Sequence, residues 1–118
     1  MASTKNESDA LHKADITNGG VALLTQVLPA QQWYKDKPMK IGLAGNDLNE
    51  RLSAVKKADD SASAEEQDEW ADQPYTLEMN ENEREAAKAC VQFFWKQGAF
   101  NLSKHIAKLI HVLGLDEA

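Results

Sequence analysis

Large apolar residues recur at a helical spacing soon after the polar start of the chain. Val21, Leu24 and Leu28 are three and four residues apart, which places them on one face of a helix. Thr17 or Asn18 precedes them as a candidate N-cap, and a proline follows them. The pattern therefore predicts a helix that starts at this cap and ends before the proline.

The next apolar residues follow a two-residue period. Met39, Ile41 and Leu43 alternate with lysine, glycine and alanine, as in a short β-strand over residues 39–44. Asp47 then stands three residues before a glutamate, which is the spacing of a capping box. A second helix is expected to begin at this aspartate and to continue for about three turns.

Three segments show neither the helical nor the two-residue spacing of apolar residues. Residues 1–15 are polar and are expected to form a mobile, disordered tail. Residues 30–38 are interpreted as a loop, and residues 59–73 as an acidic loop or linker. Trp33 lies in the first of these loops and Trp70 in the second.

The C-terminal part of the chain has the clearest pattern. Alternation over residues 74–79 predicts a second strand, and Asn80, with a glutamate three residues later, predicts the start of a helix over 81–97. A last helix is expected over 102–113, capped by Ser103 or by the asparagine two residues before it. A glycine follows each of these two helices and is typical of a helix end.

Together these elements predict an α+β fold that is mostly helical. It has about four helices, a small two-stranded sheet in which 39–44 pairs with 74–79, and a C-terminal helix-turn-helix hairpin. A single globular domain over residues 16–115 is expected. Its predicted core consists of Leu24, Leu28, Ile41, Leu43, Leu48, Leu52, Leu77, Met79, Val91, Phe94, Ile106, Leu109, Ile110 and Leu113.

Composition agrees with one small soluble domain. The chain has 118 residues, a usual domain size, and its single cysteine, Cys90, allows no internal disulfide. Its longest apolar runs are far below the roughly 20 residues that cross a bilayer, and its start lacks the apolar centre of a signal peptide. We therefore expect a cytoplasmic protein that does not contact a membrane.

Charge is unevenly distributed along the chain. The net charge of −6 disfavours general binding to nucleic acid, yet residues 59–85 hold eleven acids and residues 86–115 hold none. The last helix presents Lys104, His105 and Lys108 on its polar side, so a DNA-associated regulator that uses the C-terminal helix pair is the alternative function. The small number of basic residues speaks against this alternative, because they could neutralise only a few DNA phosphates.

No group of residues predicts catalysis or metal binding. Cys90 lies on the apolar face of its predicted helix, as a buried structural thiol does. His12, His105 and His111 lack the spacing of metal ligands. The acids of the predicted acidic loop lie where fixed geometry for acid–base chemistry is least expected. We therefore predict no enzyme activity, no metal and no cofactor.

The acidic loop is instead a candidate binding site for another protein with a basic surface. Trp70 would be its apolar anchor, and the acids would steer the partner. These acids are Glu65, Glu66, Asp68 and Glu69. These acids could mimic nucleic-acid phosphates only in a rigid array of carboxylates, and the composition of the segment does not predict a rigid structure. An exposed Trp33 or Trp95 would mark a further partner surface or a homodimer surface.

The leading hypothesis is a non-enzymatic protein-interaction or regulatory module. In its short length, polar N-terminal segment and lack of a chemical site, the chain resembles the small accessory proteins of bacteriophages and mobile elements. The resemblance is to a type of protein and not to a named family, so it assigns no residue a role.

Overall fold

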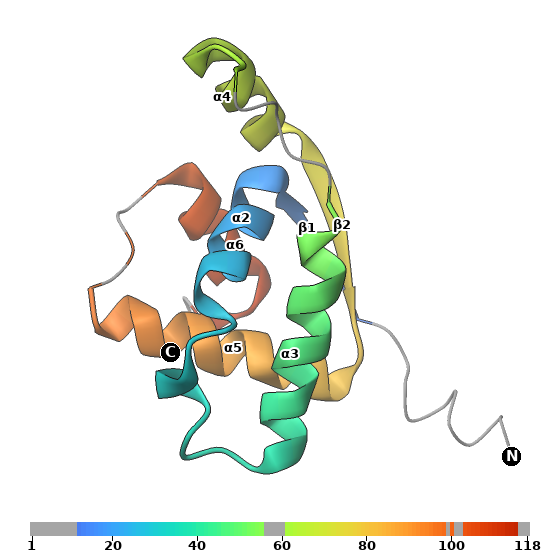
Figure 1. The fold of residues 1–118 in the computed structure, drawn as a ribbon, viewed down its shortest axis with the longest axis vertical. Helices are drawn as coiled ribbons and strands as arrows, with labels where there is room; N and C mark the ends of the chain where they lie inside the picture. Colours follow the sequence, from blue (N-terminus) through green and yellow to red (C-terminus); the bar gives the residue numbers. More distant parts are fainter. Residues whose placement is uncertain (1–11, 56–60, 99, 101–102, 116–118) are drawn as a thin grey trace, which may run out of the picture.

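The computed structural model describes residues 12–55, 61–98, 100 and 103–115. The elements of these residues are β1 (His12–Thr17), α2 (Asn18–Val27), the short 3-10 helix η1 (Gln31–Trp33), α3 (Met39–Ser53), α4 (Ala64–Asp72), β2 (Pro74–Met79), α5 (Glu81–Lys96) and α6 (Lys104–Val112). They make an α+β fold that is mostly helical, as predicted. α2 lies at the centre and contacts both strands and the helices α3, α4, α5 and α6 (Figure 1).

β1 and β2 form a two-stranded antiparallel sheet, with Ala14 opposite Leu77. Buried and exposed residues alternate along both strands, so one face of the sheet packs on the helices and the other faces solvent. The solvent face carries polar pairs between the strands, such as Lys13 directly opposite Glu78.

The sheet corrects two predictions. The partner of β2 is β1 and not residues 39–44, and residues 12–15 form a strand and not part of a mobile tail. Residues 1–11 lie outside the described residues. Only Ala14 and Ile16 of β1 are buried, and one small and one large apolar side chain in a polar stretch are a weak strand signal.

Residues 39–44 are the first turns of α3, so the predicted strand there is wrong. Pro38 precedes the first helical residue, where a missing backbone N–H costs no helical hydrogen bond. Leu48 and Leu52 are buried four residues apart and continue a helical stripe that starts before the predicted cap at Asp47. The local two-residue alternation was too short to outweigh this longer period.

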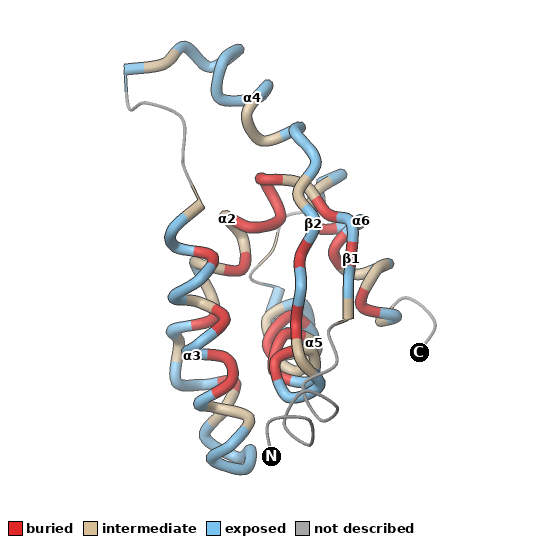
Figure 2. The backbone as a smooth tube through the Cα atoms, turned by 90° about the vertical axis from the view of Figure 1, so that its right-hand side faces the viewer, coloured by how far each residue is buried: buried red, intermediate tan, exposed pale blue. Residues whose placement is uncertain are grey.

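α4 occupies most of the predicted acidic loop, so that prediction is also wrong for residues 64–72. Ser63 accepts a hydrogen bond from the backbone N–H of Glu66, and the Glu66 side chain accepts one from the backbone N–H of Ser63. This capping box satisfies two backbone donors at the start of the helix. The burial view shows α4 extending away from the body of the molecule with no buried residue (Figure 2).

The other three α-helices have the predicted caps, and α6 is shorter than the predicted helix over 102–113. Thr17, Asn80 and Ser103 are their N-caps, and each side chain accepts a hydrogen bond from the backbone N–H three residues later. Gly98 and Gly114, which follow α5 and α6, have φ values of 73° and 75°. This left-handed conformation ends a helix at low cost only for glycine.

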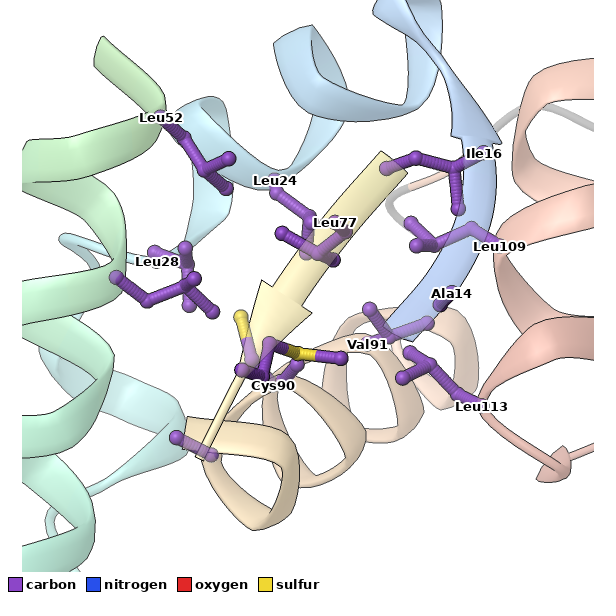
Figure 3. Packing of buried hydrophobic residues seen from close by; sticks show 14 of the residues in the cluster. Ala14, Ile16, Leu24, Leu28, Leu52, Leu77, Cys90, Val91, Leu109 and Leu113 are labelled. Carbon is purple, nitrogen blue, oxygen red and sulfur yellow. The ribbon is translucent and has the colours of Figure 1, made fainter. Parts of the chain in front are cut away.

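The core lies between the inner face of the sheet and the helices α2, α3, α5 and α6 (Figure 3). The predicted core residues that are buried are Leu24, Leu28, Leu48, Leu52, Leu77, Met79, Val91, Ile106, Leu109 and Leu113. Ile41, Phe94 and Ile110 are only half-buried, and Leu43 is exposed. The core also contains Cys90, whose burial was predicted, and side chains that were not predicted, namely Ala14, Ile16, Val21, Trp33, Ala44, Ala86 and Ala87.

Trp33 is part of the core, so its predicted place on a partner surface is wrong. Its side chain is 2% exposed, and its indole Nε1–H donates a hydrogen bond of 2.9 Å to the backbone carbonyl of Leu28. The ring lies against the backbone of α3 at Gly45, where a Cβ atom would be only 2.6 Å from Trp33 Cζ2. Gly45 is therefore needed for the close approach of the indole to the helix.

Candidate functional site

A groove of about 630 Å³ opens where the end of α2, the loop after η1 and the start of α3 meet. It is lined by Leu28, Pro29, Tyr34, Lys35, Lys37, Pro38, Met39, Gly42, Leu43 and Asn46. Its volume is in the usual range for a small binding cavity, and most of its lining side chains are apolar. We name these residues the α2–α3 groove.

Two large apolar side chains of the groove are exposed to solvent. Met39 is 79% exposed and Leu43 is 58% exposed. They lie four residues apart on α3, on a different face from Leu48 and Leu52, which point into the core. Exposed apolar side chains that line a hollow are typical of a surface that is covered when a partner binds.

Tyr34 forms one wall of the groove. Its ring packs edge-on against Trp33, with ring centroids 5.2 Å apart, and it lies over Gly42, where a Cβ atom would be 3.3 Å from Tyr34 Cδ1. Because Trp33 is fixed by its hydrogen bond and its contact with α3, the wall is attached to the core. The groove is therefore largely preformed.

The charges of the groove are positive. Lys35 and Lys37 line it, no acidic side chain does, and the nearest acid in sequence, Asp36, is exposed outside the lining. Within the part of the chain that the structure describes, neither lysine forms an ion pair. Elsewhere on the surface, lysines do pair with acids, as Lys104 does with Asp72 at 2.8 Å.

The start of α3 adds to this positive character. Among the five described α-helices, α3 is the one whose N-cap residue makes no side-chain hydrogen bond, and its first turn contains no acid. Pro38 has no side-chain oxygen to accept from the first backbone N–H groups of the helix. The positive end of the helix dipole is therefore not offset at the groove.

The acidic residues predicted to bind a partner are brought together on α4. Glu65, Glu66, Asp68 and Glu69 are all exposed. Together with Asp72, three of them have helical spacing and share one face of α4. The carboxylates are therefore in a more regular array than the sequence promised, while Trp70 beside them is half-buried.

Trp95 lies apart from α4 and is 42% exposed near the end of α5. Phe93 and Phe94 are half-buried and pack edge-on against each other, with ring centroids 5.0 Å apart. Trp95 therefore has the exposure that a partner or homodimer surface would need. A role for Trp95 in binding stays a prediction.

The basic residues of the alternative function are partly engaged within the protein. Lys104 pairs with Asp72, and His105 lies 2.7 Å from Thr17 Oγ1 through its Nδ1 atom. Lys108 is exposed. The Asp72 carboxylate offsets part of the positive charge that a phosphate would meet at the start of α6.

Thr17, His105 and Asp72 form a cluster that the spacing of the sequence did not reveal. His105 Nε2 is 3.6 Å from Asp72 Oδ1, which is too long for a hydrogen bond. Thr17 Oγ1 also accepts the backbone N–H of Gly20 and so caps α2. The His105 ring lies against Gly19, where a Cβ atom would be 2.6 Å away. The cluster joins the start of α2 to α6, and none of its three residues lines the α2–α3 groove.

Cys90 is fully buried in the core, as predicted. Burial raises the pKa of its thiol well above the ordinary value, because the charged thiolate would lose its hydration. Among the described residues, no group of three His, Cys, Asp or Glu side chains is placed to hold a metal ion.

The α2–α3 groove was not predicted from the sequence. Met39 and Leu43 were interpreted as the inner face of a strand, so their exposure was not expected. Their spacing of four residues, with Pro38 before them, was the available signal for one face of a helix. That this face is not covered depends on how α3 packs against α2 and α5, which the sequence does not display.

Comparisons of the chain with protein-family models, with curated proteins and with solved structures gave no significant match. Every helix of the described residues is too short or too polar to span a bilayer. The case for a function therefore rests on the surfaces of this chain.

Proposed function

We propose that this protein is a non-enzymatic protein-interaction module that binds another protein in the α2–α3 groove. The observation that carries the proposal is the exposure of Met39 and Leu43 beside a preformed apolar hollow. Covering two such side chains removes apolar area from water, which is the main favourable contribution to protein association. A regulatory role would follow from what the partner does.

Site-specific photo-crosslinking tests this proposal. A benzophenone amino acid at position 46 lies in the groove and leaves both apolar side chains intact, whereas the same amino acid at Ala107 is exposed on α6. In an extract of the source organism, we expect a discrete adduct with another polypeptide from position 46 and none from position 107. Leu43→Ser should reduce this adduct. Equal labelling from both positions would refute the proposal.

A second binding surface is supported by α4. This helix is held by its own capping box, buries no residue and presents acids on one face, which favours a partner with a basic surface. Lysine substitutions at Glu65 and Glu69 should weaken such binding, and moderate salt should weaken it further. The DNA-associated alternative, which uses Lys104, His105 and Lys108, remains a prediction without an observation in its favour.

A further inference from the structure

We propose that the partner's groove-binding segment is an acidic amphipathic helix, with apolar side chains on one face and carboxylates beside them. This inference rests on the proposed function and adds the chemistry of the partner. Three properties of the groove lead to it, namely its apolar lining, its charge and its position at a helix start.

The apolar part of the partner follows from the lining. Met39, Leu43 and Tyr34 offer large apolar surfaces around a concave space, and Leu28 lies beneath them in the core. Apolar anchors that enter such a groove from one face of a helix are spaced three, four or seven residues apart. The partner therefore needs an apolar face of at least two turns.

The acidic part of the partner follows from the charges. Lys35 and Lys37 line the groove without an ion pair inside the described part of the chain, although the protein as a whole has an excess of acids. The uncapped start of α3 lies at the same place, with Pro38 and Met39 in the lining. A carboxylate beside an apolar anchor would meet both the lysines and this helix start.

A homodimer in which two grooves face each other is disfavoured by the same charges. It would bring Lys35 and Lys37 of one copy next to those of the other, and like charges at an interface oppose association. The acidic α4 of a second copy is the competing occupant, because its charge also complements the groove. Its non-acidic residues are two alanines, a glutamine and a single large apolar side chain, Trp70, so an amphipathic helix of another protein with several apolar anchors fills the lining better.

The test uses three fluorescent peptides of about 16 residues, or four helical turns, and the full-length protein. The peptides share Leu and Trp at helical spacing and differ in having Glu, Gln or Lys at the remaining charged positions. In fluorescence anisotropy at low salt, the acidic peptide should bind about threefold to tenfold more tightly than the neutral one, and the basic peptide most weakly. The differences should shrink at about 500 mM salt, where screening is strong.

Variants of the exposed groove residues identify the site. Lys35→Glu combined with Lys37→Glu should reverse the order of the three peptides, and Leu43→Ser should weaken all of them. Lys108→Glu, which changes an exposed lysine on α6, is the matched control and should leave the order unchanged. Circular dichroism checks that each variant is folded.

The remaining outcomes separate the two proposals. Equal binding of the acidic and neutral peptides, lost in Leu43→Ser, would overturn the acidic partner and keep the groove as a binding site. No binding by any peptide would overturn both proposals. If a peptide of residues 61–74 bound most tightly, and the protein self-associated through Lys35 and Lys37 in sedimentation, the occupant would be a second copy and the inference would be wrong.

Discussion

At the scale of single residues, one buried charge ties three elements together. Glu83 is 4% exposed in its side chain, and its two carboxylate oxygens accept from Arg51 Nη1 at 2.8 Å and from the backbone N–H of Asn80 at 3.0 Å. Arg51 Nη2 also donates to the backbone carbonyl of Glu78 at 2.7 Å. The guanidinium therefore joins α3 to the end of β2 and the start of α5.

We expect Arg51→Met to lower the free energy of unfolding by about 2 kcal/mol, because it leaves the Glu83 carboxylate buried without its counter-charge. The value is below that of a fully buried pair, since Arg51 is half exposed to water. Urea unfolding measures it. Adding Glu83→Gln should recover about half of the loss, and Lys13→Met, which breaks a surface pair, should cost less than about 0.5 kcal/mol. Equal losses for Arg51→Met and Lys13→Met would contradict this account.

Two glycines of α3 give a matched pair for the packing of Trp33. Gly45→Ala places a Cβ atom 2.6 Å from the buried indole, whereas Gly42→Ala places one 3.3 Å from the half-buried ring of Tyr34. The first change should lower the free energy of unfolding by about 2 kcal/mol despite the better helix propensity of alanine, and the second by less than about 1 kcal/mol. Thermal unfolding compares them. An unchanged or raised melting temperature for Gly45→Ala would show that the indole is not held against α3.

The buried thiol of Cys90 should make the stability of the protein depend on pH. Because burial raises the pKa of its thiol, the folded protein keeps the proton that the unfolded chain loses above about pH 8.5. The contribution of Cys90 to the free energy of unfolding is therefore complete below that pH. It falls as the pH rises, by at most about 1.4 kcal/mol per pH unit. The difference in unfolding free energy between the native protein and Cys90→Ala should shrink between about pH 8.5 and 10. A difference that stays constant would place the thiol in contact with water.

At the scale of elements, the two capping boxes separate local from global stability. Ser63 and Asn80 make the same pair of hydrogen bonds, but α4 has no buried residue, whereas α5 buries several side chains in the core. Asn80→Ala should cost about 1 to 2 kcal/mol of global stability, while Ser63→Ala should cost less than about 0.5. Instead, Ser63→Ala should speed hydrogen exchange in the amides of α4 alone. A global loss as large as that of Asn80→Ala would mean that α4 supports the core.

The elements also show what the sequence could predict. The caps of α2, α5 and α6, the proline stop of α2 and the glycine stops of α5 and α6 were predicted correctly, because these signals act within a few residues of the helix ends. β1 was missed, since its pairing with β2 depends on residues about sixty positions away. α4 was missed because a helix without an apolar stripe has no period to detect.

The candidate site was predictable only in part. The acids of α4 were recognised as a candidate binding site from composition, although they were placed in a loop, and Trp95 was named as a partner surface on the condition that it is exposed. The groove could not be predicted from the sequence. Trp33 lies in the core because its indole donates to a carbonyl at the end of α2 and because Gly45 leaves space for the ring. These contacts between distant elements decide which apolar side chains stay exposed.

At the scale of the whole molecule, Met39 and Leu43 are expected to contribute to binding and not to folding. The double change Met39→Ser and Leu43→Ser should leave the free energy of unfolding within about 0.5 kcal/mol of the native value, because neither side chain is buried. It should also lower the fluorescence of a bound apolar dye. Urea titration and dye binding measure the two effects. A loss of more than about 2 kcal/mol would assign these side chains to the fold.

The position of α4 has a consequence for assembly. It extends from one end of the molecule, and the start of α3, which borders the groove, lies at the other end in both views (Figures 1 and 2). Two ligands bound at these ends would not collide with each other. If both proposed surfaces are used, the protein would be a small bridge between a basic molecule at α4 and an acidic one at the groove.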